Sequence, residues 1–473
     1  MLKTRWVALL CALVLVSSAC GSRLNDDDLA SGGGTGGGGV TQTTSGSGAS
    51  GAGISSGSGT TGPKIGTLPV PCGKAPGGGA PKAPTTAGPG VSADKIKIAV
   101  ISDRAGTVKV PTISIEESMV AFTEWCNGFG GVNGRKLELT KIDSKLFSQL
   151  EATREACDDK VFAIVGSGSV TDNQGAQAMV DCKLIEVPAY TVTPDKGLSD
   201  RLVAPLPNPT YSYNSGPARY MKKQFPDAIK KAAIVHGNIE AVNIQAARVK
   251  EAYEKMGYTF IYDKQTDVIQ ESYASEAKAM KDAGVEYFTM ISATSETAKM
   301  LRDMKTQGFE PKVIDLGQQF YDTDLLAEPG AEGAYVLLNT VPFEEASDSP
   351  ALQAFLDAYE GSSAPNKPDP TSLGVQSFSA GLLFATALKA AGDDLTRDNV
   401  LAELKKIKEW DGGGLHYTTD PGDNAGSDCF MYDRVKDGKF VREFPAETAT
   451  FECDPDYPIE LTGDYGKGAS AAG

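Results

Sequence analysis

Apolar and polar positions follow two alternating periods along the chain after residue 91. Short apolar runs, of which Lys95–Ser102 (KIKIAVIS) is the first, have the length and the β-branched composition of buried strands. Between them lie segments such as 113–127, whose apolar residues recur every three or four positions, as on one face of a helix. Strands that alternate with helices are typical of a parallel sheet with helices on both faces.

The alternation occurs in two successive blocks of similar size. The first block predicts strands at residues 95–102, 136–142, 162–165 and 184–191, with helices at 113–127, 149–159 and 175–181. The second block predicts strands at 231–235, 259–262, 287–291 and 312–316, with helices at 212–225, 243–256, 273–283 and 296–307. Two such blocks predict an α/β protein with two similar lobes, each built on a doubly wound parallel sheet.

The order of elements changes after residue 341. Amphipathic helices are predicted at 350–359, 375–391 and 397–407, followed by a hairpin at 429–435 and 439–444. These elements are too few for a third α/β domain, so we expect them to complete both lobes. Lobe 1 would then comprise residues 92–211 and 341–411, and lobe 2 residues 212–340 and 412–473.

The first twenty residues have the features of an export signal. A basic start with Lys3 and Arg5 precedes an apolar core and small residues before Cys20. This predicts a signal peptide over 1–19. The ending VSSAC is similar to a bacterial lipobox, which implies lipidation of Cys20; the alternative is an ordinary signal peptide cut nearby. Residues 20–91, rich in Gly, Ser, Thr and Pro, are interpreted as a flexible tether, with Cys72 as the exception that would attach its end to the folded body. We expect no other apolar stretch to be long enough to cross a bilayer.

Charge and cysteine content narrow the class of protein. The net charge of −16 becomes −18 without Lys3 and Arg5, which disfavours nucleic acid as a partner because phosphates would be repelled.

Six of the eight cysteines remain after Cys11 is removed and Cys20 is lipidated. An even number in an exported protein indicates disulfides, although six cysteines allow fifteen pairings. We expect Cys157–Cys182 and Cys429–Cys453, which leaves Cys72–Cys126.

The segment VFAIVGSGSVTDN, residues 161–173, is the strongest candidate for a binding element. A short apolar strand is followed at once by Ser167, Gly168, Ser169 and Thr171, which form a turn before a helix. Such a turn offers backbone N–H groups and hydroxyls to a polar ligand. Ligands of open α/β sheets bind outside the carboxyl ends of the strands. The turn is therefore predicted to border a cleft, unless its small residues serve only to make a tight turn.

Other strand ends carry small polar residues as well. They are Ser102–Arg104, Thr191–Thr193, His236–Asn238, Ser292–Thr294 and Gly317–Gln319. They offer hydroxyl, amide and backbone hydrogen bonds, and few of them offer a base. No P-loop, dinucleotide fingerprint or G-x-S-x-G elbow occurs, and with two histidines and no C-x-x-C a metal site is disfavoured. The pattern favours a site that binds without reacting, with no catalytic residue, cofactor or metal.

Taken together, residues 95–454 resemble the leucine/isoleucine/valine-binding family of substrate-binding proteins of ABC importers. The resemblance is carried by IKIAVIS, FGGVNGRKLEL, AIVGSGSVTD, EVPAYTVTPD and KAAIVHGN in this order. It implies a type I periplasmic-binding fold, in which two lobes joined by three crossover segments close on a ligand.

The resemblance also implies which positions meet the ligand. The first lobe would use Ser167, Gly168, Ser169, Thr171, Thr191 and Thr193, and the second lobe the strand ends at His236, Asn238, Ala293 and Gln318. Gln318 stands where amino-acid binders of the family usually have an acidic residue, and the aromatic residue expected near Ala293 is missing. In the first loop, which also holds Asp103, Arg104 is a candidate partner for an anionic ligand group; the alternative is an exposed loop charge.

These observations predict a monomeric, lipid-anchored solute-binding protein on the extracytoplasmic face of the cell membrane. It would deliver a small polar or amphipathic ligand, such as an amino acid, amide or organic acid, to an ABC permease and its ATPase. Three alternatives stay open at this point. They are a sensory protein of the same fold, a hydrolase that uses Ser167 or Ser169 with His236, and a structural cell-surface protein.

Overall fold

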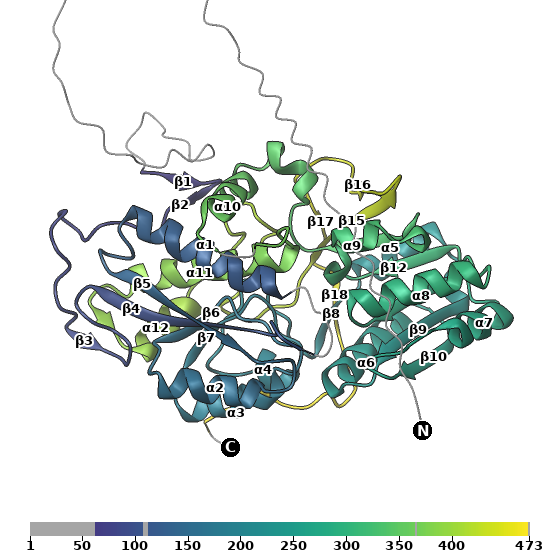
Figure 1. The fold of residues 1–473 in the computed structure, drawn as a ribbon, viewed down its shortest axis with the longest axis horizontal. Helices are drawn as coiled ribbons and strands as arrows, with labels where there is room; N and C mark the ends of the chain where they lie inside the picture. Colours follow the sequence, from purple (N-terminus) through teal and green to yellow (C-terminus); the bar gives the residue numbers. More distant parts are fainter. Residues whose placement is uncertain (1–61, 107–111, 365–366, 472–473) are drawn as a thin grey trace, which may run out of the picture. The chain divides into compact units, whose positions relative to one another are not determined.

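The computed structural model of the protein describes residues 62–106, 112–364 and 367–471. The predicted signal peptide, Cys20 and the first part of the predicted tether lie outside these described residues. Two parallel sheets organise the described chain (Figure 1), one in the order β5-β4-β6-β7 and one that runs β10-β9-β11-β12-β13 before antiparallel β15 and β16. The prediction of an α/β protein with two parallel-sheet lobes is confirmed.

The first sheet has helices on both faces. Its elements are β4 (Lys95–Ser102), α1 (Ile113–Phe129), β5 (Lys136–Asp143), α2 (Gln149–Asp158), β6 (Ala163–Val165), α3 (Asn173–Asp181), β7 (Ile185–Val187) and α4 (Pro194–Gly197). Along β4, Ile96, Ile98 and Val100 belong to the core under α1, whereas Ala99 and Ile101 belong to the core under α2 and α3. Alternate side chains of this fully buried strand therefore pack into the two cores on opposite faces of the sheet.

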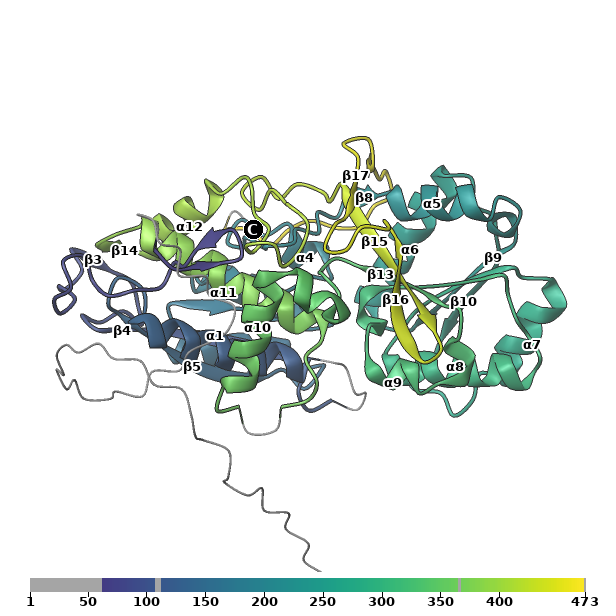
Figure 2. The same ribbon diagram turned by 90° about the horizontal axis from the view of Figure 1, so that it is seen from above.

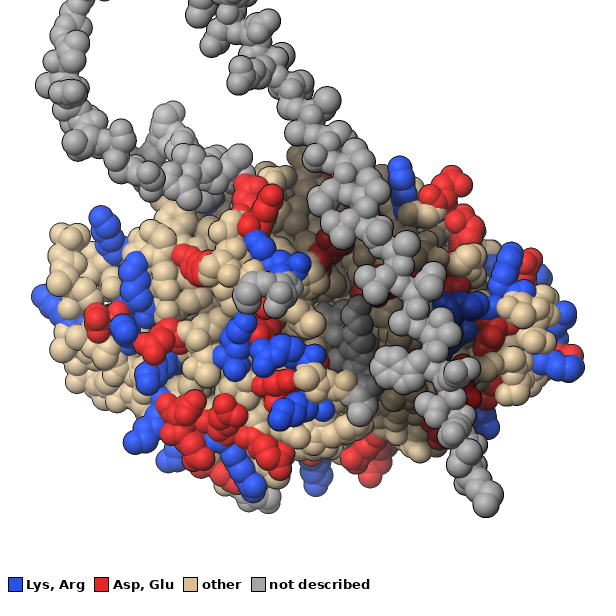
Figure 3. Space-filling model, in the orientation of Figure 1, with Lys and Arg blue, Asp and Glu red and all other residues tan. Residues whose placement is uncertain are grey.

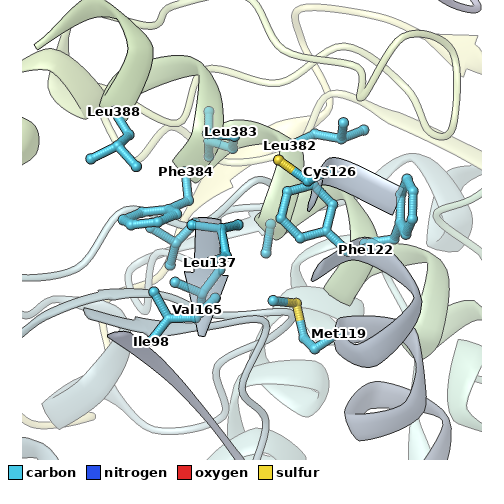
Figure 4. Packing of buried hydrophobic residues seen from close by; sticks show 14 of the residues in the cluster. Ile98, Met119, Phe122, Cys126, Leu137, Val165, Leu382, Leu383, Phe384 and Leu388 are labelled. Carbon is cyan, nitrogen blue, oxygen red and sulfur yellow. The ribbon is translucent and has the colours of Figure 1, made fainter. Parts of the chain in front are cut away.

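The larger core of the first lobe is completed from the distant end of the chain. Helices α10 (Pro350–Gly361), α11 (Ser372–Ala390) and α12 (Arg397–Lys405) return to this lobe. Figure 4 shows Leu382, Phe384 and Leu388 of α11 facing Ile98 and Val165 of the sheet and Phe122 of α1. In the described part of the chain, α11 is the one helix long and apolar enough to span a membrane by composition; 83% of its apolar window is buried inside the protein. The length and apolar composition of α11 are therefore explained by its position in the core of the first lobe.

The second lobe repeats the design. Its elements are β8 (Ser212–Asn214), α5 (Gly216–Gln224), β9 (Ala232–Gly237), α6 (Glu240–Lys255), β10 (Phe260–Thr266), α7 (Ala274–Ala283), β11 (Tyr287–Ile291), α8 (Thr294–Thr306), β12 (Val313–Leu316), α9 (Thr323–Leu326), β13 (Tyr335–Leu338), β15 (Cys429–Lys436), β16 (Lys439–Phe444), β17 (Glu452–Cys453) and β18 (Pro458–Glu460). Figure 2 shows α5 and α6 on one side of this sheet and α8 and α9 on the other. The two cores again take alternate strand residues, Ala233 and Val235 on one face and Ala232 and Ile234 on the other.

Residues 62–91 correct the prediction that the tether is flexible up to residue 91. They form the hairpin β1 (Lys64–Ile65) and β2 (Leu68–Pro69), and β3 (Thr86–Ala87) pairs with β14 (Asp394–Leu395). Ile65, Val70 and Cys72 are buried in the first core. Low apolar content misled the prediction here, because a few apolar side chains and one disulfide suffice to attach a segment to a core that already exists.

Two local predictions were also wrong. The fourth strand ends at Val187 instead of Thr191, because the chain leaves the sheet at Pro188 and residues 188–193 form a loop. Residues 212–214, predicted as the start of a helix, form β8, which pairs with β18. Their partner strand lies almost 250 residues further along the chain, and local periodicity carries no information about such a pairing.

Three disulfides tie the described chain together. They are Cys72–Cys126, Cys157–Cys182 and Cys429–Cys453, as predicted.

The surface seen in Figure 3 carries Lys and Arg among Asp and Glu, so both signs of charge are mixed on this face.

A buried carboxylate lies within the tyrosine-rich face of the second sheet. Asp315 on β12 is 4% exposed and accepts hydrogen bonds from the hydroxyls of Tyr287 and Tyr432, the latter at 3.0 Å from Oδ1. Burial raises the pKa of Asp315 from 3.8 to about 6, because the charged form is poorly solvated, and the tyrosine hydrogen bonds only partly oppose this.

Replacing Asp315 with Asn should flatten the dependence of stability on pH. Between pH 4 and 6 the folded protein holds a proton on Asp315 that the unfolded chain has released. The wild type should therefore become more stable as the pH falls from about 7 to about 4, with a contribution from this group of up to about 3 kcal/mol. Chemical denaturation of wild type and Asp315→Asn across this range measures the difference. The exposed Asp267→Asn is the control, and equal pH profiles for Asp315→Asn and wild type would contradict the assignment.

Candidate functional site

A cavity of about 280 Å³ lies where strand ends of both sheets meet. From the first lobe it is bordered by the loops after β5, β6 and β7, and from the second lobe by the loops after β9, β10, β11 and β12. All of these loops follow the carboxyl ends of parallel strands, where open α/β sheets bind ligands. The position of the cavity is the one that the strand-end pattern of the sequence indicated.

The walls of the cavity are largely aliphatic. The first lobe contributes Leu146, Val170, Val192 and Leu373, and the second lobe Ile239, Val242, Val268 and Ile291. Polar side chains come from Tyr190, Thr191, Asn208, Gln245, Ser292 and Gln318, among others. Among the described residues that line this cavity none carries a charge. Such a site suits a ligand with a substantial apolar part and a few polar groups.

Asp103 holds two of the loops that border the cavity. Its carboxylate accepts hydrogen bonds from the hydroxyls of Ser144 (2.6 Å) and Ser169 (2.9 Å) and from the backbone N–H groups of Leu146 (3.1 Å) and Val170 (2.8 Å). Burial raises its pKa, and these four hydrogen bonds oppose the rise. Because Leu146 and Val170 line the cavity, the carboxylate fixes the shape of one wall.

The hydroxyls of Ser167 and Thr171 also bond to the protein. Ser167 donates to Glu186, which pairs with the buried Lys196 at 2.5 Å, and Thr171 donates to the carbonyl of Leu146. These two hydroxyls therefore donate their hydrogen bonds within the protein.

Asp172 secures the loop after β7 in the same way. It accepts hydrogen bonds from the Thr193 hydroxyl (2.6 Å) and from the backbone N–H of Val192 (2.7 Å). Burial raises its pKa to about 7. Gly168 is required beside this loop, since a Cβ atom there would lie 2.3 Å from Cε1 of Tyr190.

Of the twelve predicted ligand-binding residues, three line the cavity: Thr191, Ala293 and Gln318. Asp103, Ser169, Thr171 and Thr193 lie directly behind its wall, where they make the hydrogen bonds described above, and Ser167 and Gly168 belong to the same turn. Arg104 is 42% exposed and is bonded to Glu116 at 2.7 Å, so its charge is balanced outside the cavity.

The two remaining candidates, His236 and Asn238, flank Gly237, which does line the cavity. The Nε2 atom of His236 lies 3.8 Å from Oδ1 of Asp263, and neither Ser167 nor Ser169 bonds to it. The hydrolase alternative therefore finds no nucleophile–base pair at these positions. His416, the other histidine, is buried and bonds to Ser379 at 2.8 Å, consistent with a structural role.

Sequence reasoning missed several lining residues. Gln245 lies in the middle of α6, and Asn208 lies in the segment that connects the lobes, so neither follows a strand. The aliphatic members, such as Val242 and Leu373, have the same residue types as core positions. A search of strand ends alone finds polar loop residues, and the apolar wall becomes visible only in three dimensions.

A second cavity of about 220 Å³ adjoins the first. Tyr190, Thr191, Asn208, Gln245 and Gln318 line both cavities and therefore form the boundary between them. Arg248 is the one charged residue among the described residues that line the second cavity. In this part of the chain no group of three His, Cys, Asp or Glu is placed to hold a metal ion.

Replacing Asp103 with Ala should destabilise the protein and weaken ligand binding together. The substitution leaves four donors without their acceptor, which costs at least about 4 kcal/mol at roughly 1 kcal/mol or more for each. Ser169→Ala removes one of these hydrogen bonds and should cost about 1 kcal/mol. Urea denaturation of the two variants measures both values. Equal losses for Asp103→Ala and Ser169→Ala would show that the carboxylate does not organise the wall.

Comparisons with known proteins agree with this geometry. The family model described as periplasmic binding protein matches residues 95–439. The LivJ branched-chain amino acid transporter substrate binding protein of Streptococcus pneumoniae, in complex with isoleucine, is 16% identical at a TM-score of 0.60, with 74% of this chain and 100% of that chain covered. The fatty acid ABC transporter substrate-binding protein of Thermomonospora curvata is 20% identical at a TM-score of 0.65, with coverage of 77% and 96%.

A third similar structure is the ABC transporter solute binding protein of R. palustris in complex with 4-hydroxybenzoate. It is 19% identical at a TM-score of 0.63, with 77% of this chain and 99% of that chain covered. No curated protein sequence matches the chain significantly. At these identities the structures show the shared fold, and the family model, which spans most of the chain, shows the family. The chain belongs to the periplasmic binding protein family and has its type I fold.

Proposed function

We propose that the protein is the lipid-anchored solute-binding component of an ABC importer on the extracytoplasmic face of the membrane. It captures one small polar or amphipathic molecule in the cavity between the strand ends and delivers it to a permease and its ATPase. The observation that carries the proposal is the cavity itself, which has aliphatic walls, a few amide and hydroxyl groups, and loops contributed by both lobes.

The similar structures support a small organic ligand. Their names specify isoleucine, a fatty acid and 4-hydroxybenzoate, which share an apolar part and a polar head. The serine–histidine alternative has no support in the geometry, because the cleft serines donate to the carboxylates of Glu186 and Asp103 and neither bonds to His236. The proposal therefore includes no covalent step.

Lipidation of Cys20 would keep the binding protein near its permease. Attachment through the segment between Cys20 and residue 62, which is rich in Gly, Ser and Thr, would raise the local concentration of the lobes at the membrane. The basic start, the apolar run and the small residues before Cys20 support this part of the proposal.

A thermal-shift screen of the folded part, residues 62–473 made in an oxidising compartment, tests the function. A ligand at about one hundred times its dissociation constant should add roughly 2.7 kcal/mol to the free energy of unfolding. Amino acids, amides, organic acids and sugars form the library. Ala293→Trp should abolish the shift, because Ala293 lines the cavity and the indole would fill it.

The matched control for this screen is Ala283→Trp, which places the same side chain at the exposed end of α7. It should keep the ligand shift of the wild type. A folded wild type that responds to no compound in a broad library would contradict the proposed function. A shift that persists in Ala293→Trp would move the site away from this cavity.

Membrane attachment is tested separately with the full chain in a bacterial host. The wild type should sediment with the membrane fraction, and Cys20→Ala should appear in the soluble exported fraction. Cys11→Ala, inside the predicted signal peptide, is the control and should remain membrane-bound. Identical fractionation of Cys20→Ala and wild type would show that the thiol of Cys20 is not the anchor.

A further inference from the structure

Arg248 is a buried cation that has no carboxylate partner among the described residues. It lies on α6, is 2% exposed, and its guanidinium donates to the carbonyls of Thr210 (2.8 Å) and Pro209 (2.9 Å). The guanidinium also lies 5.9 Å from the ring centre of Tyr213. All of its hydrogen-bond acceptors are neutral amide or carbonyl oxygens.

The positive charge of Arg248 is therefore left uncompensated at the cavities. Glu251, one turn further along α6, bonds to Lys255 at 2.8 Å and to Tyr465. An arginine stays protonated even when it is buried, and an unpaired buried charge is costly unless something balances it. An anion close to Arg248 would supply that balance.

Gln245 connects the buried charge of Arg248 to the first cavity, because it bonds to Arg248 and lines that cavity. Nη1 of Arg248 lies 3.0 Å from Oε1 of Gln245. Because an arginine can only donate, the amide oxygen of Gln245 must face it, and the amide NH₂ must face the opposite way. Gln245 is half-buried, lines the first cavity, and its Nε2 has no hydrogen-bond partner among the described residues. This NH₂ is a free donor backed by a positive charge.

Gln318 presents a second donor at the same boundary. Its Oε1 accepts a hydrogen bond from Nε2 of Gln376 at 2.8 Å, which leaves its own NH₂ without a partner in the described chain. Gln245 and Gln318 both line the two adjoining cavities, so both side chains lie at the boundary between them. Two N–H donors near an uncompensated cation select a negatively charged acceptor.

The remainder of the first cavity selects against a second charge. Its walls are aliphatic, as with Val170, Ile239 and Ile291, and no acidic side chain lines it among the described residues. The ammonium group of an amino acid would lose its water there without gaining an ionic partner. The tail of the ligand must therefore be apolar.

We propose that the ligand is an aliphatic monocarboxylate without an ammonium group. Its alkyl chain lies along the aliphatic wall, and its carboxylate accepts hydrogen bonds from the side-chain amides of Gln245 and Gln318, with Arg248 balancing the charge from behind. This inference rests on the proposed function and narrows it to one class of solute. It also places the anionic head at the second lobe, away from the serine turn after β6, whose hydroxyls are committed to Asp103 and Glu186.

Three compounds with the same tail and different heads test the ligand class. They are octanoate, octan-1-ol and 2-aminooctanoate, each titrated calorimetrically into the folded part, residues 62–473. Octanoate should bind at least about tenfold more tightly than either of the others, because charge-assisted hydrogen bonds are lost in the alcohol and an unpaired ammonium is buried in the amino acid. Octanoate binding no tighter than octan-1-ol binding would overturn the proposal. So would tighter binding of 2-aminooctanoate.

Variants then test where the head lies. Gln245→Ala and Gln318→Ala should each weaken octanoate about tenfold or more and leave octan-1-ol nearly unchanged. Gln245→Glu, of nearly the same shape, places a carboxylate against Arg248 and should remove octanoate binding. Gln265→Ala is the matched control, since Gln265 is exposed on β10 and bonds to Asn243. Thermal melting of each variant shows whether it is folded.

The outcomes separate this inference from the function on which it rests. Octanoate binding that is unaffected by all three variants would overturn the placement of the head. A library in which amino acids or amides stabilise the protein and octanoate does not would overturn the ligand class and leave the solute-binding function standing. No response to any compound would remove both. The comparison of the three heads on the wild type needs no variant, so it decides the ligand class even if every substitution prevents folding.

Discussion

The shape of the cavity depends on hydrogen bonds to two buried carboxylates, Asp103 and Asp172. Asp103 accepts hydroxyls and backbone N–H groups from the loops after β5 and β6. Asp172, itself in the turn after β6, accepts a hydroxyl and backbone N–H groups from the loop after β7. Loops at strand ends have no ladder partners of their own, so their donors must be satisfied in another way. Gathering them on a carboxylate fixes the loops relative to one another and turns flexible connections into a preformed wall.

This solution determines which groups remain for a ligand. The hydroxyls of Ser167, Ser169 and Thr193 are used in holding the wall, so the first lobe faces the cavity mainly with aliphatic side chains. In the proposed mode of binding, the polar group of the ligand is recognised by side-chain amides at the boundary of the two cavities. Gln245 and Gln318 each have their oxygen held by a neighbour, and their orientation is therefore set before a ligand arrives. Preorganised donors of this kind lose little entropy on binding.

Arg248 is the least expected member of the site, because a buried guanidinium surrounded only by neutral oxygens is costly by itself. It joins the segment at residues 208–212, which connects the lobes, to α6 of the second lobe. The same side chain thus links the connection between the lobes to the polar end of the cavity. A ligand that balances this charge would bind and stabilise that junction at once.

The sequence by itself determined the two lobes, the approximate positions of most elements and the presence of disulfides, because periodicity, turn residues and cysteine number can be read directly from the chain. It identified Thr191, Ala293 and Gln318 as strand-end residues that the structure places on the cavity. Only the tertiary structure decided that Ser167, Ser169 and Thr171 bond to the scaffold and that residues 62–91 attach to the first core. It also decided that Gln245 lines both cavities and that Arg248 lines the second one. Each of these outcomes depends on partners that are far apart in the sequence, and no local pattern records such partners.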